Sequence, residues 1–311
     1  MKFKKIINGL KWVWFVAVLI ASGWYIVARF PQLRSSLSTI SGGRLIISFL
    51  FLCAGKVLTT DLTYHSLMAA PQIVPFKDAF AITTITQLGK YLPGGVWHFA
   101  GKFGVYKARG FTAKAAIQPI ILENLWLMAS SLFVGLSALL LSDNQLPCTH
   151  VPFLCDQQIA SWTVILLFFA WIVSIYLIER FFFKINMSVT ARLRLVLEKV
   201  ALWTIFGTSF WLIFPVQSNW MVSLQAISAF SISWLIGYLA FFAPGGIGVR
   251  EAVMVFILSS FISLESLALY TAIHRLLWVG AEIGLALIAM LLFGLPLGMD
   301  ASEKKERQGD R

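Results

Sequence analysis

Charged residues are scarce in this chain, and their scarcity excludes an ordinary soluble domain. Asp, Glu, Lys and Arg make up 13% of the 311 residues, whereas about a quarter is usual in soluble proteins. Hydrophobic residues make up 59%, and the mean hydropathy is +0.81. At about 20 residues per spanning helix, this length allows about six to ten membrane segments. We therefore expect an integral membrane protein without a soluble catalytic domain.

Acidic residues are the rarer of the two signs of charge. The chain has 14 Asp and Glu against 25 Lys and Arg, which gives a formal net charge of +11. Such an excess is also found in nucleic-acid-binding proteins, but here the basic residues lie at the ends of apolar runs. That placement is typical of cytoplasmic loops and of contact with anionic lipid headgroups. We expect membrane lipids as partners, and no nucleic acid.

Cysteine and catalytic motifs are also in short supply. Three cysteines are too few for a fold built on disulfides. Cys53 lies in an apolar run and is expected to pack there. Cys148 and Cys155 share one polar loop, where they could form a disulfide or remain two free thiols. The chain has no Walker loop, dinucleotide fingerprint, Gly-x-Ser-x-Gly or metal-ligand motif. We expect no catalytic residues, no cofactor and no metal.

Long apolar runs are what the sequence does have, and they predict an all-α polytopic membrane protein. About six runs are long enough to cross fully: residues 12–28, 45–70, 115–141, 159–178, 200–216 and 267–293. Two broken helical hairpins, re-entrant or short, are expected over residues 76–92 with 96–108 and 220–243 with 247–261. The first run follows a basic flank and is interpreted as an uncleaved helix rather than a signal peptide. Both termini are expected in the cytoplasm.

Two Pro-Gly-Gly triplets interrupt these hairpins. Proline removes a backbone donor and glycine tolerates almost any conformation, so one helix should end and another begin at each triplet. In hydrocarbon such a break is tolerated only where it is buried in protein or lines a wet cavity. The new helix presents free N–H groups and a positive dipole end, which suit an anion such as a lipid phosphate. The alternative is a tight turn whose neighbouring cations extend to the lipid headgroups.

The candidate headgroup-binding residues surround the two triplets. They are Lys90, Pro93, Gly94, Gly95, His98, Lys102, Pro244, Gly245, Gly246, Arg250 and Glu251.

An internal repeat relates the two triplets. Shifting the sequence by 151 residues places the first on the second, and it also places the polar pair 123–124 on 274–275. We predict repeat 1 over 44–142 and repeat 2 over 195–294. The remaining parts are an N-terminal helix with an exoplasmic linker (1–43), a linking region with one span (143–194) and a basic cytoplasmic tail (295–311). The single linking span inverts repeat 2, as in many secondary transporters.

A polar network inside the apolar runs is the second candidate site, because ionisable groups at membrane depth must face protein or water. Its members are Lys56, Asp61, His65, Glu123, Asn124, His274, Arg275 and Glu282. We expect Lys56 and Asp61 to neutralise each other, and Arg275 to pair across the repeat interface with either Glu123 or Glu251. A purely structural network and a role in a transport cycle both stay open at this point.

A family resemblance is carried by the segments 90–102 (KYLPGGVWHFAGK) and 241–252 (FFAPGGIGVREA), together with 109–111 and Glu123. Through these residues, the stretch of about 45–293 resembles the transmembrane, flippase-like region of the lysylphosphatidylglycerol synthase family. Members often follow the glutamate with arginine and a later aspartate, where this chain has Asn124 and Leu127. The resemblance implies a stand-alone lipid-translocating part without the soluble aminoacyl-transfer domain. It also implies that such members serve cell-envelope polysaccharide or glycolipid pathways.

The leading hypothesis is therefore a multi-pass flippase of the bacterial inner membrane. It would move an anionic phospholipid or a lipid-linked glycan between leaflets. One alternative is a membrane enzyme or accessory subunit acting on lipid-linked sugars, with catalysis by Glu123, Glu251 or Glu282. The other is a non-transporting scaffold for envelope-synthesis proteins.

Overall fold

The structure is a computed structural model in which every described element is helical. It describes residues 38, 40–68, 74–91, 96–142, 156–183, 188–215, 220–240 and 243–294. The expected first span, the first Pro-Gly-Gly triplet and the tail lie outside these residues, and so do Cys148 and Cys155.

Five of the described helices are long and apolar enough to cross a membrane. They are α3 (Gly42–Met68), α6 (Ala113–Leu141), α8 (Gln157–Leu177), α10 (Trp220–Leu239) and α12 (Leu264–Phe293). This confirms an all-helical membrane protein. The run expected over 200–216 belongs instead to α9 (Val189–Trp211). This helix begins earlier because its first turns are basic but still helix-forming, a feature that an apolar-run criterion misses.

The first interrupted region forms short helices, as the sequence predicts, whereas the second begins with α10, which is long enough to cross a membrane. In the first, α4 (Phe76–Gln87) continues into the 3₁₀ turn η1 (Leu88–Tyr91), and α5 (Trp97–Ala108) follows. In the second, α10 is followed by the 3₁₀ turn η4 (Pro244–Gly246) and by α11 (Val249–Leu258). Gly245, Gly246 and Gly248 have φ angles of 61°, 72° and 83°. Only glycine adopts such angles readily, which explains why the turn that leads into α11 forms at these residues.

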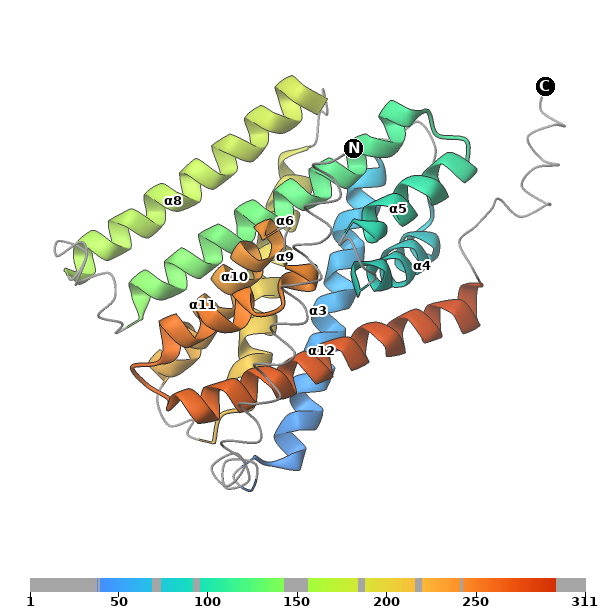
Figure 1. Ribbon diagram of the computed structural model, residues 1–311. Coiled ribbons are helices and arrows are strands. Elements are labelled where there is room, and N and C mark those ends of the chain that lie inside the picture. Colours follow the sequence, from blue (N-terminus) through green and yellow to red (C-terminus); the bar gives the residue numbers. More distant parts are fainter. Residues whose placement is uncertain are drawn as a thin grey trace, which may run out of the picture.

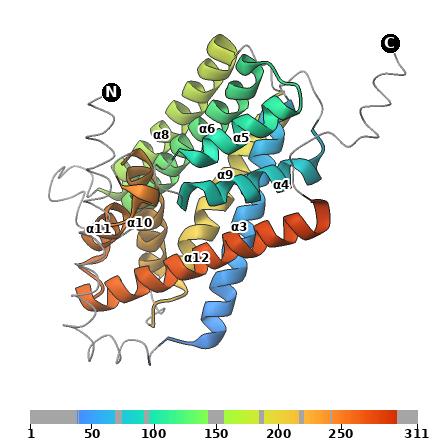
Figure 2. The same ribbon diagram turned by 45° about the vertical axis from the view of Figure 1, so that its right-hand side comes forward.

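The long helices pack in a pattern that interleaves the two halves of the chain. Helix α3 packs against α9, α6 packs against α10, and α12 packs against α4. Figure 1 shows α3 rising through the middle of the view with α9 beside it, and α12 crossing α3. The turned view in Figure 2 shows the same crossing of α12 over α3, with α4 running beside α12. The larger hydrophobic cluster therefore draws on both halves, and a smaller one lies within the first half, between the end of α3, α4, α5 and the start of α6.

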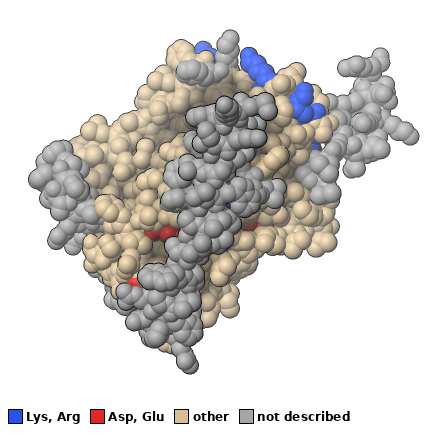
Figure 3. Space-filling model, viewed as in Figure 1, with Lys and Arg blue, Asp and Glu red and all other residues tan. Residues whose placement is uncertain are grey.

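The outer surface is apolar, as expected for contact with lipid. Helix α8 packs on α6 and presents Leu166 and Phe169 outward with 69% and 60% of their surface exposed. On α12, Leu291 is 84% exposed. Figure 3 shows a mostly uncharged face with Lys and Arg gathered along its upper edge. Exposed apolar area on this scale marks a surface covered by lipid in a protein with five candidate spans.

Small residues allow the central helices to approach closely. A Cβ atom added to Gly207 on α9 would strike the Cα and side chain of Ile227 on α10, and one added to Gly55 on α3 would strike the ring of Phe206. Such small-residue contacts are how membrane helices gain packing energy without a hydrophobic driving force between them.

We predict that Gly207→Ala destabilises the protein by about 1–3 kcal/mol, because the added methyl group meets backbone that cannot move aside. Gly284→Ala on α12 is the matched control, since no atom lies within 4 Å of its added Cβ. The measurement is the melting temperature of each purified variant in detergent. Equal melting temperatures for the two variants would contradict the close approach of α9 and α10.

Candidate functional site

A cavity of about 180 Å³ lies where the two halves of the chain meet. One water molecule needs only about 10–15 Å³, so the cavity has room for a larger polar group. Its lining comes from α3, α4, η1, α5 and α6 in the first half and from α9, α10, η4, α11 and α12 in the second. The cavity therefore belongs to the interface between the halves.

The cavity wall carries an excess of positive charge. Lys56, Lys90, Arg250 and Arg275 line it, together with His98, and none of its described lining residues is Asp or Glu. Four cations from four different elements thus converge on one buried space. Concentrating like charge in a low-dielectric site is costly unless an anion or a nearby carboxylate compensates for it.

Glu282 on α12 supplies part of the compensation from just behind the wall. It is 3% exposed and accepts hydrogen bonds from Lys56, from Lys90 at 2.5 Å and from the Tyr91 hydroxyl at 2.6 Å. The Lys56 ammonium also lies 3.4 Å from the centre of the Trp278 ring, a cation–π contact. One carboxylate from the second half therefore holds two lysines from the first half.

Glu251 compensates for Arg275 and at the same time fixes the second Pro-Gly-Gly turn. Arg275 Nε donates to Glu251 Oε1 at 2.9 Å, and its Nη2 donates to the carbonyl of Gly245 at 3.2 Å. The other Glu251 oxygen accepts from the Gly248 N–H at 2.6 Å. Of the two partners expected for Arg275, the structure has Glu251. Because both residues lie in the second half, this ion pair does not cross the interface as expected.

Arg250 is held against the cavity wall by the shape of the backbone. Its side chain crosses Gly237 and Gly246, where an added Cβ would strike it, and its guanidinium carbon lies 5.9 Å from the centre of the Trp234 ring. Its Nε is buried and has no hydrogen-bond partner among the described residues. Arg250 lines the cavity and makes no ion pair with a described carboxylate, so its guanidinium is available to an anion that enters.

We predict that Gly237→Ala weakens anion binding about tenfold, equivalent to about 1.4 kcal/mol, with little change in melting temperature. The added methyl group meets the flexible Arg250 side chain, which can move away from the wall while α10 stays in place. Titration of the purified variant with inorganic phosphate measures the effect, and Gly284→Ala again serves as control. Unchanged phosphate affinity in Gly237→Ala would contradict the placement of Arg250.

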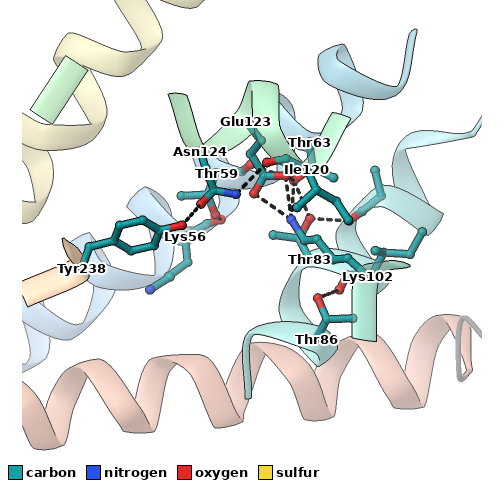
Figure 4. Close-up of polar contacts among 12 residues, drawn as sticks. Lys56, Thr59, Thr63, Thr83, Thr86, Lys102, Ile120, Glu123, Asn124 and Tyr238 are labelled. Carbon is teal, nitrogen blue, oxygen red and sulfur yellow. Dashed lines mark hydrogen bonds and ion pairs between the residues drawn. The ribbon is translucent and has the colours of Figure 1, made fainter. Parts of the chain in front are cut away.

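Lys102, expected to bind a headgroup, lies in a separate buried network beside the cavity. Its Nζ contacts both Glu123 oxygens at 2.7 and 2.6 Å, and Glu123 also accepts from Thr63 at 2.9 Å. Thr83 donates to Thr63 at 2.9 Å (Figure 4). Lys102 and Glu123 are both 3% exposed and are not among the cavity-lining residues. Lys102 therefore forms an ion pair with Glu123 and does not line the cavity.

Asn124 points the other way from its neighbour Glu123. In Figure 4, Glu123 faces Lys102 whereas Asn124 faces Tyr238. Asn124 Oδ1 accepts from the Tyr238 hydroxyl at 2.5 Å, its Nδ2 donates to the Ile120 carbonyl at 2.7 Å, and it lines the cavity. The polar pair of the sequence thus serves two different sites.

The expected pairing of Lys56 with Asp61 is wrong. Residues five apart on a helix are about 140° apart around its axis, so their side chains point to different faces. Asp61 instead contacts His65 Nδ1 at 2.9 Å and Arg194 at 3.2 Å, near one end of α3.

His274, another expected member of the polar network, is buried with its Nε2 2.9 Å from the Ser209 hydroxyl.

Sequence reasoning missed the aromatic part of the cavity lining. Phe99, Trp203, Phe206, Trp234, Tyr238 and Trp278 all belong to it. The available signal was the four-residue spacing of Trp234 and Tyr238 just before the second Pro-Gly-Gly triplet, which places both rings on one face of α10.

No protein-family model matches this chain, and no curated protein matches its sequence. The resemblance to the lysylphosphatidylglycerol synthase family therefore stays a prediction. Within the described residues, no group of three His, Cys, Asp or Glu side chains is arranged to hold a metal ion. The chemistry of the cavity lining is therefore the basis for proposing a function.

Proposed function

We propose that this protein moves lipids with an anionic headgroup between the leaflets of the bacterial inner membrane. The observation that carries the proposal is the cavity lined by Lys56, Lys90, Arg250 and Arg275, with no Asp or Glu among its described lining residues. The two carboxylates in contact with these cations are Glu282 and Glu251. Four cations against two carboxylates leave two positive charges in excess, which suits a phosphate.

The chemistry of the wall fits a phosphate well. Arginine offers a planar set of donors that binds phosphate oxygens in pairs, and lysine adds a mobile point charge. These contacts are stronger in a buried site than in water because the local dielectric constant is low. Inside a membrane, a lipid headgroup is the phosphate most readily available.

The arrangement of helices supports two repeats related by an offset of 151. Adding 151 to the first residue of α6, 113, gives 264, the first residue of α12, and the bounds of α5 fall within a residue of those of α11. Thr112 and Ser263, also 151 apart, each cap the following helix by accepting from the N–H three residues on. The packing of α6 on α10 is matched by that of α12 on α4.

The second Pro-Gly-Gly triplet lines the cavity, and so do described residues on either side of the first in the sequence. Gly245 and Gly246 of the second triplet line it, and so do Lys90 and Val96, which flank the first triplet in the sequence. Binding at broken helices between inverted repeats is the usual arrangement in secondary transporters, which open the site by moving one repeat against the other. The proposal places the headgroup at this interface.

In the proposed transport cycle, Glu282 couples binding of the headgroup to movement of the two halves. A phosphate that enters the cavity competes with Glu282 for Lys56 and Lys90, which come from the other half of the chain. Weakening these contacts loosens the halves from each other, so that binding of the headgroup favours their movement. The alternative of a membrane enzyme is less well supported, because Glu123 and Glu282 are paired with lysines and do not line the cavity.

The experiment is a translocation assay with purified protein in vesicles. Phosphatidylglycerol with a fluorescent acyl chain is placed in both leaflets, and an impermeant reductant bleaches the outer one. With the protein present, we expect the inner-leaflet fluorescence to be lost as well, whereas protein-free vesicles keep it. Equal protection in the two preparations, for every anionic lipid tried, would contradict the proposal.

A further inference from the structure

Beside its cations, the cavity has an aromatic wall that an anion alone does not require. We define this wall as Phe99, Trp234 and Tyr238, all of which line the cavity and are partly exposed. The Trp234 and Tyr238 rings are stacked, 5.1 Å apart with 15° between their planes. Phe99 meets Tyr238 edge-on at 6.4 Å. The three rings form one continuous aromatic surface beside the cations, built from two stacked rings and one edge-on ring.

Uncharged hydrogen-bonding groups surround this wall. Asn124, Gln87 and Thr59 line the same cavity. Asn124 is held in place through Tyr238 and the Ile120 carbonyl, so its amide has a fixed direction (Figure 4). Fixed amides and hydroxyls next to flat rings can bind hydroxyl groups at defined positions.

The cations exclude one class of headgroup. A headgroup with an amine beyond its phosphate would bring positive charge to a space where Lys56, Lys90, Arg250 and Arg275 already meet. Aromatic faces can bind quaternary ammonium groups, but here protein cations occupy that role. Arg250 lies 5.9 Å from the Trp234 ring centre, and Lys56 lies 3.4 Å from that of Trp278. Like-charge contact is an effective means of rejecting a ligand.

We propose that the cavity takes a glycosyl phosphate headgroup, with the phosphate on the cations and a sugar ring on the aromatic wall. A sugar presents a C–H face that packs on Trp234 and Tyr238, and its hydroxyl groups reach Asn124, Gln87 and Thr59. Such a headgroup is anionic, uncharged beyond its phosphate and rich in hydroxyls, so it matches both parts of the lining. This inference rests on the proposed function for its lipid cargo, but the binding preference is tested separately.

The test uses water-soluble probes and the purified full-length protein in detergent. Binding of a hexose 1-phosphate, inorganic phosphate and phosphorylcholine is measured by titration calorimetry. We expect the hexose phosphate to bind about tenfold more tightly than inorganic phosphate, and phosphorylcholine to bind most weakly. Equal affinities for the sugar phosphate and inorganic phosphate, or tightest binding of phosphorylcholine, would overturn the inference.

Two variants locate the preference within the cavity. Trp234→Leu is expected to remove the roughly tenfold advantage of the hexose phosphate over inorganic phosphate, although both affinities fall because Trp234 also contacts Arg250. Tyr238→Phe keeps the ring and is expected to retain most of the advantage. Trp162→Leu is the matched control, because this tryptophan lies on α8 and is 60% exposed to lipid. A full advantage for the hexose phosphate in Trp234→Leu would overturn the role of the aromatic wall.

Translocation distinguishes this inference from the proposed function. Vesicles are prepared with a glycosyl phosphate lipid, phosphatidylglycerol or an aminoacylated phosphatidylglycerol, and we expect the first to cross fastest and the last slowest. Sugar-selective binding without movement of any lipid would contradict the proposed function and leave the glycosyl phosphate site intact. Movement of all three lipids at one rate would keep the transport function and overturn the headgroup preference.

Discussion

Vesicles containing the Arg250→Gln variant are expected to translocate a fluorescent anionic lipid about tenfold more slowly than wild-type vesicles, or slower still. Hydrogen bonds to charged groups contribute about 1.5–3 kcal/mol each, and each 1.4 kcal/mol is a factor of about ten. Within the described structure, Lys56 and Lys90 are engaged by Glu282 and Arg275 by Glu251. Arg250 has no such ion pair there, and its buried Nε is unpartnered, so it has the most to give to an entering phosphate.

The matched control for this prediction is Arg194→Gln. The Arg194 side chain is 60% exposed and pairs with Asp61 and Glu198 near the end of α3, away from the cavity lining. The Arg194→Gln substitution removes the same charge from the protein as Arg250→Gln, so a general effect of net charge would appear in both variants. Comparable slowing in both would contradict the special role of Arg250, and so would a normal rate in Arg250→Gln.

The Glu282→Gln variant is expected to lose about 3–5 kcal/mol of stability, because Lys56 and Lys90 then lack the carboxylate that they share in the wild type. Glu282 is 3% exposed, Lys56 is 9% exposed, and Tyr91 also donates to this carboxylate. Glutamine keeps the size and some of the hydrogen bonds of glutamate but not the charge. The two ammonium groups then repel each other in a site with little water.

A second substitution separates this repulsion from simple loss of packing. Adding Lys90→Met to Glu282→Gln removes one of the two charges and is expected to recover part of the lost melting temperature, since Lys56 keeps its contact with Trp278. Arg194→Gln, which breaks an exposed ion pair, should cost under about 1 kcal/mol. A double variant less stable than Glu282→Gln would contradict the repulsion account.

The helices were predictable because their signals are local. Long apolar runs indicated α3, α6, α8 and α12, whereas the span-length helix α10 was expected only as part of a broken hairpin. The triplet at 244–246 indicated that α10 gives way to α11. The offset of 151 follows from the same breaks, together with the polar pair 123–124. In each case neighbouring residues in the chain determine the conformation, so no knowledge of packing is needed.

The partners of the charged residues were not predictable in the same way. Lys56 and Glu282 are 226 positions apart in the chain, and their contact depends on how α12 crosses α3. Glu123 meets Lys102 and Thr63 because α5 and α3 pack on α6, which the sequence does not show. The aromatic wall was missed for a related reason: aromatic residues are common in lipid-facing helices, and only packing shows which rings face a cavity.

Labelling of the cavity in working vesicles tests most directly that lipid headgroups pass through it. Val96 lines the cavity and is 54% exposed, so Val96→Cys in a chain without Cys53, Cys148 and Cys155 offers one thiol to an impermeant reagent. We predict that complete labelling stops translocation and that an anionic lipid slows the labelling. Labelling of Val189→Cys, 78% exposed at the start of α9, should leave translocation unchanged. Full translocation after complete labelling at position 96 would contradict the account.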